Sequence, residues 1–370
     1  MIEISRYEVQ GGVSEYHVMI HVDNPRLAYA EQMKSVLSAY PQLLEGELKG
    51  AVTVLKRFFL SDAANQSDYL QTLLVEQEAC PLSIVEQSPL NGTKIALWAY
   101  LQKGVELKAL SHGMYEVKHG AYRHLWMAGA CHETSDAEAQ TRQLFDDYIT
   151  LLREQGCTLA ENCLRTWFFV QNVDVNYAGV VKARNEVFAT QNLTNQTHFI
   201  ASTGIAGRHA NHHVSVLMDA YAVQGIRQEQ IRYLYAPTHL NPTYEYGVSF
   251  ERGTAVDYGD RRQVFISGTA SINNKGEVVH PGDICKQTLR MWENVEVLLA
   301  EAECTFEHVS HLIVYLRDVA DYIVVKEMFD ERFPNIPKVY LLAPVCRPGW
   351  LIEMECMAVK TIHNERFPAY

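Results

Sequence analysis

The sequence predicts an α+β fold built from tandem copies of one structural unit. Gln140-Thr141 recurs as Gln287-Thr288, and Asp174 recurs as Asp321, each pair 147 positions apart (287 − 140 and 321 − 174). A duplicated supersecondary unit explains such a fixed offset better than chance does. Since ligand pockets form preferentially between packed units, we expect the functional site in a cleft between copies.

Each of the two clear copies predicts the order strand, helix, strand, helix, strand. The first strand ends in a glycine, which suits a sharp turn with positive φ. The apolar positions after it recur every three to four residues, as on one buried helix face. Each second helix begins with an aspartate, a favourable N-cap. The predicted strands are 125–129, 165–170 and 214–222 in one copy and 264–268, 311–317 and 351–358 in the other, with second helices at 174–188 and 321–333.

The N-terminal third fits the same pattern with losses. Its apolar runs at 16–22, 52–60 and 95–100 are typical of strands, and 26–44 is typical of a helix. Any α+β domain would give similar strands. A degenerate third copy and an unrelated domain therefore both remain open for this part of the chain.

We expect three units, at residues 1–112, 113–235 and 236–370. Glycine and proline interrupt the pattern near both junctions. The second junction, 224–252, is long for a linker and carries Tyr244 among several aromatic residues. Long irregular segments often line sites, but an aromatic-rich loop packed over a sheet edge is an equal alternative.

Length and composition are those of a soluble enzyme. The chain has 370 residues, 48% of them hydrophobic, and a formal net charge of −12, which disfavours a nucleic-acid partner. Its eight cysteines form no CxxC pair and lie mostly in apolar runs, as buried thiols do in a reducing cytosol. We find no leader pattern and no apolar run of membrane-spanning length. We therefore expect a cytoplasmic protein with no membrane partner.

The last third of the chain resembles the RidA/YjgF family. Members are small α+β subunits that form barrel-like trimers of the chorismate-mutase-like type, with ligand pockets between neighbours. The resemblance implies that three tandem RidA/YjgF-like repeats form a pseudo-trimer within one chain. It is carried by Val264–Gly268, Gly282-Asp283, Gln287-Thr288, Val314–Asp318, Pro337 and Leu351–Ala358.

Three further features resemble the chorismatases, which are proteins of this length with RidA-like domains. They are the segments Thr197–Ile205 and Tyr258–Arg262, and Cys346 seven positions before Glu353 (353 − 346). The resemblance implies removal of pyruvate from chorismate without a cofactor, giving 3- or 4-hydroxybenzoate or a dihydroxycyclohexadiene carboxylate. The implied partner is a small carboxylate, and the protein is expected to be a monomer or low-order oligomer.

Two other functions remain open. One is a RidA-like enamine or imine deaminase, and the other is a protein that binds a small metabolite without catalysis. The RidA carboxylate-binding arginine lies fifteen positions before the glutamate, where this chain has Lys338 (353 − 15). Because lysine lacks the planar fork of arginine, this difference argues against ordinary deamination.

Glu353 is the first candidate for a catalytic residue. In a strand, Glu353 and Glu355 share one face, and a solvent-facing carboxylate is the simpler interpretation of that pattern. The family resemblance instead implies a pocket carboxyl that acts as acid and base. Such a group needs an apolar cleft that raises its pKa toward neutrality.

Cys346 is the second catalytic candidate. The resemblance implies that it shapes the pocket near the ring in enzymes that make a hydroxybenzoate. The alternative is a small apolar filler before the turn at Pro348-Gly349.

A substrate with two carboxylates requires arginine forks or backbone N–H donors. Any single arginine on an acidic protein is more simply explained as a surface ion pair. His209, His212 and His213 lack partners at metal-ligand spacing and predict no metal site. The substrate-binding candidates are Arg208, Arg347, Tyr244, Thr203-Gly204 and Ser267-Gly268, with the Arg261-Arg262 pair as a further possibility.

Overall fold

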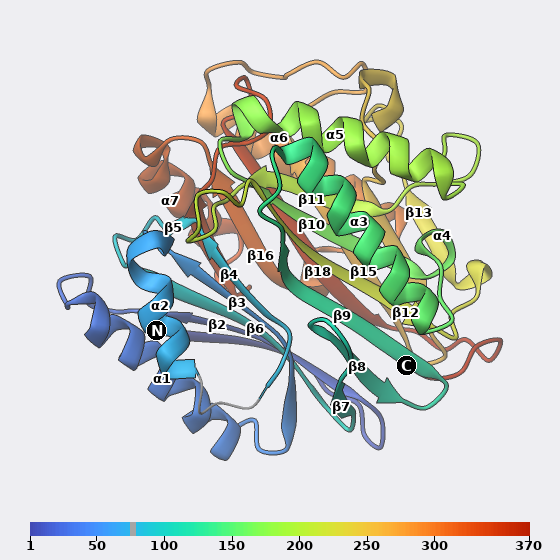
Figure 1. Ribbon diagram of the computed structural model, residues 1–370, viewed down its shortest axis with the longest axis horizontal. Helices are drawn as coiled ribbons and strands as arrows, with labels where there is room; N and C mark the ends of the chain where they lie inside the picture. Colours follow the sequence, from blue (N-terminus) through green and yellow to red (C-terminus); the bar gives the residue numbers. More distant parts are fainter. Residues whose placement is uncertain (75–78) are drawn as a thin grey trace.

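The computed structural model of the protein describes residues 1–74 and 79–370 and contains three β-sheets (Figure 1). The first sheet has the order β1-β2-β6-β3-β4 and carries two helices. Its elements are β1 (Ile2–Tyr7), β2 (Ser14–His21), α1 (Tyr29–Glu45), β3 (Ala51–Leu60), α2 (Ala63–Leu74), β4 (Leu82–Glu86) and β6 (Ile95–Lys103).

The second sheet has the order β11-β10-β12-β9-β8-β7. Its helices α3 and α5 pack against each other over one face. Its elements are β7 (Glu106–Ala109), β8 (Met114–His119), β9 (Tyr122–Cys131), α3 (Ala137–Glu154), α4 (Leu159–Asn162), β10 (Cys163–Val170), α5 (Val173–Thr190), β11 (Ala201–Ala206) and β12 (Val216–Gln224).

The third sheet has the order β13-β14-β15-β18-β16-β17-β5, so the short strand β5 (Ser88–Pro89) crosses over from the N-terminal part of the chain. Short 3-10 helices lie at Gln228–Gln230, Thr243–Tyr246, Phe306–His308 and Val319–Asp321. The remaining elements are β13 (Ile231–Leu234), β14 (Gly253–Asp257), β15 (Arg261–Ala270), α6 (Ile284–Glu301), β16 (Val309–Leu316), α7 (Tyr322–Arg332), β17 (Lys338–Leu342) and β18 (Ile352–Thr361).

One strand arrangement occurs in all three sheets. A first strand pairs with the closing strand, the closing strand pairs with the second strand, and a short strand runs parallel to the second. The series are β2-β6-β3-β4, β9-β12-β10-β11 and β15-β18-β16-β17. The N-terminal third is therefore a further copy of the unit, and the predicted tandem α+β fold is confirmed.

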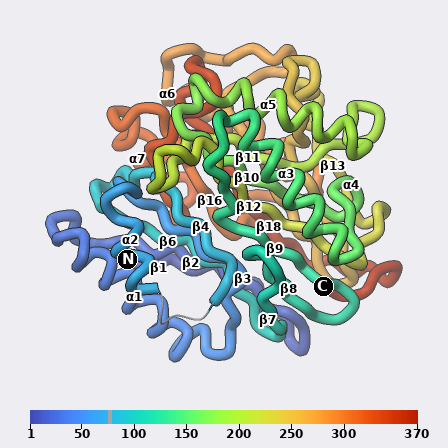
Figure 2. Tube along the Cα trace, viewed as in Figure 1, coloured from blue at the N-terminus to red at the C-terminus, as the bar shows by residue number. Residues whose placement is uncertain are grey.

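The helices lie on the outside and the inner faces of the sheets meet (Figures 1 and 2). One buried cluster includes Trp98, Trp126 and Phe265, one from each sheet. Burying large aromatic side chains of this kind is a major source of folding free energy. The three units consequently share a core, as the expected pseudo-trimer requires.

The structure differs from the sequence prediction at several local points. The helix expected to begin at Asp174 has Asn172 as its N-cap. Asp321 is the N-cap of α7 as predicted, but its side chain makes no capping hydrogen bond, and Asp318 caps the 3-10 turn ahead of α7. Gly129 has the predicted positive φ of 68°, whereas Gly268 does not have a positive φ. The division at 112/113 and 235/236 stays a prediction, although β7, placed in the first unit by it, pairs within the second sheet.

Two features are absent from the described residues. Within 1–74 and 79–370, no helix combines the length and apolar character needed to cross a bilayer. In the same ranges, no three His, Cys, Asp or Glu side chains are grouped so as to hold a metal ion.

Candidate active site

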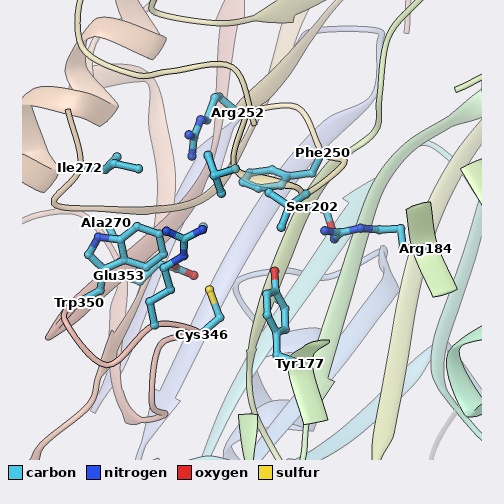
Figure 3. Close-up of a pocket in the computed structure, with 15 residues that line it drawn as sticks. Tyr177, Arg184, Ser202, Phe250, Arg252, Ala270, Ile272, Cys346, Trp350 and Glu353 are labelled. Carbon is cyan, nitrogen blue, oxygen red and sulfur yellow. The ribbon is translucent and has the colours of Figure 1, made fainter. Parts of the chain in front are cut away.

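Glu353 lines a cavity between the second and third units (Figure 3). Its strand β18 lies between β15 and β16, where Ala270 and Tyr315 are its partners across the ladders. The cavity wall comes from α5 and β11 of the second unit and from the third unit's loops 246–252 and 346–350. Glu353 is only 5% exposed, so its side chain faces an enclosed space at the seam between copies.

The predicted alternation of β18 is confirmed, but the solvent-facing interpretation of Glu353 is wrong. Glu353 and Glu355 share a face, and Glu355 is 3% exposed. This face is covered by the second unit, because Glu355 accepts hydrogen bonds from Arg165 and Trp167 of β10. Packing between units thus converts a polar strand face into an interior.

The environment of Glu353 favours its protonated form. Burial raises the pKa of Glu353 to about 8; the nearby Glu355 carboxylate acts in the same direction, and Arg252 and Arg165 oppose it. Among the described residues, none donates a hydrogen bond to the Glu353 carboxyl group. The group is therefore a carboxylic acid at neutral pH and is able to give up a proton.

Gly268 is packed directly against this carboxyl group. A Cβ atom at position 268 would lie 2.2 Å from Glu353 Oε1 and 3.0 Å from Thr203 Cγ2. No real Cβ makes a contact as short as the first. Glycine is required here by close approach and not by backbone conformation.

Cys346 and Tyr177 point into the same space as Glu353 (Figure 3). Burial raises the pKa of the Cys346 thiol to about 12, and Glu353 adds to the effect. Burial likewise raises the pKa of the Tyr177 hydroxyl. Both groups are neutral at physiological pH, so Cys346 is a small neutral wall of the cavity and not a thiolate nucleophile.

Three arginines surround the acid. Arg184 of α5 is 1% exposed, and its Nε and Nη2 atoms are buried without a hydrogen-bond partner. Arg252 is 5% exposed and also has an unpartnered Nε, while its Nη2 donates to Asn241. Arg347 lies over the rings of Tyr246 and Trp350, 4.7 and 5.2 Å from their centres.

Guanidinium groups without an ion-pair partner in an enclosed cavity indicate a site for an anionic ligand. Across the part of the chain that the structure describes, none of these three arginines forms an ion pair. A buried charge without a partner is costly, and a carboxylate ligand would offset that cost with charge-assisted hydrogen bonds. The cavity therefore combines one proton donor with several binding groups for anions.

Comparisons with known proteins identify similar sequences and a similar fold. Residues 253–360 match the family model described as Endoribonuclease L-PSP. A 3-hydroxybenzoate synthase of Streptomyces hygroscopicus is 27% identical over 256 residues, covering 63% of this chain and 73% of the relative. A solved chorismatase structure superposes with a TM-score of 0.68 and 18% identity, covering 93% of this chain and 98% of the other. The chain is therefore similar to the chorismatases and has their fold over almost its whole length.

The third unit of the chain also has shorter relatives. A RutC family protein of Pyrococcus abyssi is 35% identical over 100 residues, which are 26% of this chain and 78% of the relative. A 3-aminoacrylate deaminase RutC of Acinetobacter baylyi is 31% identical over 97 residues, again 26% of this chain and 77% of the relative. These matches agree with RidA-like units in a chorismatase fold.

The chorismatase fold brings five of the nine predicted residues to the cavity wall. They are Glu353, Cys346, Gly204, Gly268 and Arg347. Thr203 and Ser267 lie behind the wall and hold it together. Thr203 Oγ1 accepts from the Gly268 N–H at 2.9 Å, and Ser267 N donates to the Arg252 carbonyl at 3.0 Å. The backbone donors of Ser267 and Gly268 are thus already used, contrary to the expectation that they face a ligand.

Arg208 and Tyr244 lie outside the cavity, which corrects two sequence predictions. Arg208 is paired with Glu86 at 3.2 Å, because the chain after β11 turns toward the first unit. Tyr244 lines a neighbouring cavity beyond Phe250 and Arg252. From the long second junction it is Tyr246 that reaches the site.

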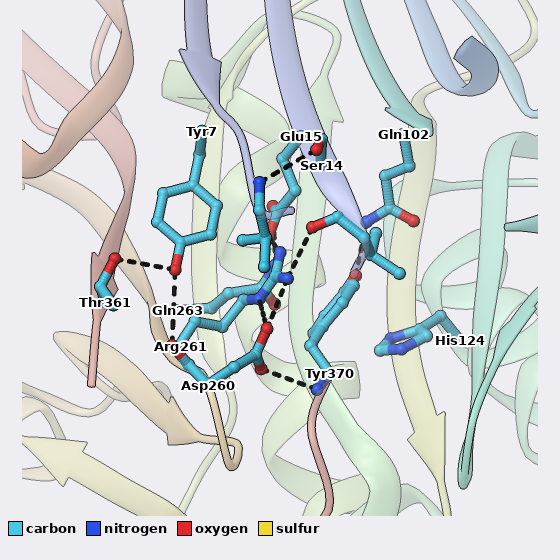
Figure 4. A network of polar contacts seen from close by, with 12 residues as sticks. Tyr7, Ser14, Glu15, Gln102, His124, Asp260, Arg261, Gln263, Thr361 and Tyr370 are labelled. Atoms are coloured by element: carbon cyan, nitrogen blue, oxygen red, sulfur yellow. Dashed lines mark hydrogen bonds and ion pairs between the residues drawn. The ribbon is translucent and has the colours of Figure 1, made fainter. Parts of the chain in front are cut away.

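Two other basic candidates are also placed elsewhere. The Arg261 guanidinium pairs with Glu15 at 2.6 Å in a separate network (Figure 4). Arg262 pairs with Asp257. Lys338 Nζ donates to the carbonyls of Phe333 and Ile336 and lines a different cavity. The position of the RidA arginine therefore does not face Glu353 in this chain.

Sequence reasoning missed Arg184, Arg252, Tyr177 and Trp350. A signal existed for Arg184. It lies between Val180 and Val187 on the buried face of α5, where a charged residue is unusual. Arg252, by contrast, lies in an irregular segment whose sequence shows no periodic pattern.

Proposed function

We propose that this protein removes pyruvate from chorismate, with Glu353 as the general acid. The observation that carries the proposal is the buried carboxyl group of Glu353, whose pKa burial raises to about 8, in a cavity lined by Arg184, Arg252 and Arg347. A 3-hydroxybenzoate synthase relative, 27% identical over 256 residues, supports the same reaction class.

The reaction requires a proton on carbon. Glu353 donates its proton to the methylene carbon of the enolpyruvyl ether, which leaves an oxocarbenium-like centre. Water attack on that intermediate, followed by C–O cleavage, gives pyruvate and a dihydroxycyclohexadiene carboxylate. Capture of the same centre by the neighbouring ring hydroxyl forms a second C–O bond to it. Cleavage of one ring carbon–oxygen bond, loss of a ring proton and opening of the remaining ketal C–O bond then give pyruvate and a hydroxybenzoate with no net consumption of water. The resulting Glu353 carboxylate then takes up the proton that either route releases.

The arginines supply binding and orientation. Chorismate carries two carboxylates, and we assign them to Arg184 and Arg347, with Arg252 adjoining. When each carboxylate enters the cavity, hydrogen bonds from planar guanidinium groups replace the hydrogen bonds that it made to water. Gly204 and Gly268 add no side chain to the cavity wall. At position 204 there is also no room for one, because a Cβ atom there would lie 2.7 Å from the Tyr177 ring. Thr203 and Ser267 support this wall, and we assign no ligand contact to Arg208 or Tyr244.

We assign the choice of product to Cys346. Its neutral thiol adjoins Glu353 and narrows the space available to water at the ring. A narrower space favours capture by the ring and hence a hydroxybenzoate. We further propose that the enzyme needs no cofactor and works in the cytoplasm as a monomer or low-order oligomer. Its eight cysteines form no CxxC pair and lie mostly in apolar runs, which supports a reducing compartment.

The test is to incubate the purified protein with chorismate, measure pyruvate enzymatically and identify the other product by mass and NMR. We expect stoichiometric pyruvate and one aromatic or diene product. Glu353→Gln, which keeps size and polarity, should lose turnover while its far-UV circular dichroism stays unchanged. Normal turnover by this variant would refute the assignment. Thermal stabilisation by chorismate without any product would indicate a binding protein instead.

A second candidate function is deamination of an enamine or imine. The 31% identity to a 3-aminoacrylate deaminase RutC over 97 residues favours it. The position of Lys338, in a cavity separate from Glu353, argues against it. Ammonia release from freshly generated 2-aminoacrylate, with none of the chorismate products, would establish this alternative.

A further inference from the structure

Glu355 lies behind the Glu353 cavity in a buried polar network. Its carboxylate accepts hydrogen bonds from Arg165 Nη2 at 2.7 Å, from Trp167 Nε1 at 2.9 Å and from the Thr203 hydroxyl. All three donors belong to the second unit, on β10 and β11. These three charge-assisted and neutral hydrogen bonds fix the Glu355 carboxylate in position.

The network continues to the first unit and is balanced in charge. Arg57 Nη1 lies 3.8 Å from Glu355 Oε1, and Arg57 Nη2 lies 2.7 Å from Asp219. Two guanidinium groups, Arg57 and Arg165, thus face two carboxylates, Asp219 and Glu355. The network as a whole is neutral, and removal of one carboxylate would leave an excess positive charge in the interior.

Glu355 is coupled to the acid through backbone and side chain. It lies two residues from Glu353 on the same face of β18. Thr203 Oγ1, which donates to Glu355, also accepts the N–H of Gly268, the residue packed against the Glu353 carboxyl. Strands β10, β11 and β18 therefore hold the charge of Glu355 at a fixed place close to Glu353.

Other groups face Glu353 from every neighbouring element. The cations are three arginines of the cavity and Arg165 of β10, and the neutral acids are two tyrosines and one cysteine. Glu355 is the one carboxylate that acts on Glu353 within residues 1–74 and 79–370. These groups are Tyr177 and Arg184 on α5, Arg165 on β10, Arg252 before β14, Tyr315 on β16, and Cys346 and Arg347 in the loop before β18.

We propose that Glu355 is a positioning residue whose fixed negative charge keeps Glu353 in its acid form at neutral pH. The inference rests on the proposed function, since it assigns Glu353 the role of proton donor. Burial is the larger influence on Glu353, and Glu355 offsets the surrounding arginines; without Glu355 the fraction of Glu353 in the acid form near neutral pH would fall. The second unit thereby contributes to catalysis through Arg165 and Thr203, which hold Glu355 in place.

The test compares Glu355→Gln with the wild type in two measurements. The first is the pH dependence of kcat/KM for chorismate. Its alkaline limb should move to lower pH by about one unit, so that kcat/KM at pH values above the limb falls about tenfold. The second is titration of the Glu353 carboxyl by infrared difference or ¹³C NMR spectroscopy of labelled protein. Glu353→Gln identifies the signal. We expect the same shift in both measurements and partial recovery of activity at lower pH.

Glu15→Gln is the matched control. Glu15 is also a buried carboxylate, 2% exposed, that accepts from Arg261 at 2.6 Å and from Gln263 and Tyr100 (Figure 4). It belongs to a different network, so its replacement should lower stability without moving the limb or the Glu353 titration. A purely structural role of Glu355 predicts that both variants behave alike, with no shift in either.

Two results would overturn the proposal. One is an unchanged Glu353 titration in folded Glu355→Gln. If Glu355→Gln does not fold, the Glu353 titration is measured in Asp219→Asn instead. Asp219→Asn, which leaves Arg57 uncompensated in the same network, should then move the titration in the same direction by a smaller amount, and no shift would refute the idea. Because the spectroscopic titration needs no turnover, a failure of chorismate as substrate is distinguishable from a failure of this inference.

Discussion

Asp219 and Glu355 occupy equivalent positions in consecutive sheets. Each lies on the closing strand at the register shift opposite the first strand, between Met218 and Ala220 in β12 and between Met354 and Cys356 in β18. Each receives a side-chain donor from the preceding unit, Arg57 for Asp219 and Trp167 for Glu355. The repeat therefore carries a carboxylate link from unit to unit.

The catalytic candidate does not repeat in the same way. Two residues before Asp219 the second unit has Leu217, where the third unit has Glu353 before Glu355. An apolar residue at this place contributes to the core instead of lining a site. Of these two sheets, only the third carries an acid at that position.

The link in the second sheet predicts a large effect on stability. Asp219→Ala leaves Arg57 buried without its ion-pair partner and should lower the free energy of unfolding by about 3–5 kcal/mol. Urea denaturation followed by circular dichroism measures the change. The double variant Arg57→Met with Asp219→Leu should recover most of the loss. A single variant as stable as the wild type would contradict this account.

The packing of Gly268 against Glu353 predicts a specific loss of activity. Gly268→Ala inserts a methyl group where no space exists and must displace the Glu353 carboxyl, so kcat should fall by about 100-fold or more. Turnover of chorismate and far-UV circular dichroism are measured together. A variant that keeps both its fold and full activity would show that the position of this carboxyl is unimportant.

Arg184 predicts opposite effects on binding and stability. Arg184→Met removes a buried guanidinium with unpartnered nitrogens and should weaken chorismate turnover by roughly 10- to 100-fold through KM. Stability should stay equal or rise, because an uncompensated charge has been removed. Arg208→Met serves as the control, since its exposed pair with Glu86 should matter little. Equal activity of the two variants would argue against a carboxylate contact for Arg184.

The raised pKa of Glu353 predicts how stability depends on pH. Between about 4.5, its ordinary value, and about 8, the folded protein binds this proton more tightly than the unfolded chain does. Stability from this group is therefore complete below pH 4.5 and is lost as the pH rises to 8, by up to about 1.4 kcal/mol per unit.

Glu353→Gln should consequently be more stable than the wild type at pH 8, by on the order of 1–3 kcal/mol. The difference should shrink toward pH 5. Calorimetry at four pH values between 5 and 8 measures it. A difference that is constant across this range would mean that the folded protein does not hold the proton.

Cys346 predicts a change of product without loss of turnover. Cys346→Ala enlarges the space beside Glu353 and should admit water, moving the product ratio from hydroxybenzoate toward the diene diol. Product analysis by liquid chromatography and mass spectrometry gives the ratio, and total pyruvate serves as the internal control. An unchanged ratio would assign Cys346 to packing alone.

Much of the fold could be predicted from sequence because it depends on local patterns. The fixed offset of the Gln-Thr pairs located equivalent helices, and period two placed Glu353 and Glu355 on one face. Gly268 lines the cavity, as expected, but it lacks the positive φ expected at the end of its strand. Its φ is ordinary, and it is the Glu353 carboxyl that excludes a side chain.

The sequence by itself determined the repeated unit, the strand that carries Glu353 and the order of the elements, because these follow from periodicity and spacing along the chain. Only the tertiary structure decided which polar groups meet. The second unit covers the strand face that carries Glu353 and contributes Arg184, whose Nε and Nη2 atoms have no hydrogen-bond partner. Its Arg208 pairs with Glu86 of the first unit instead of lining the cavity. These outcomes depend on contacts between residues far apart in sequence, which local propensity does not encode.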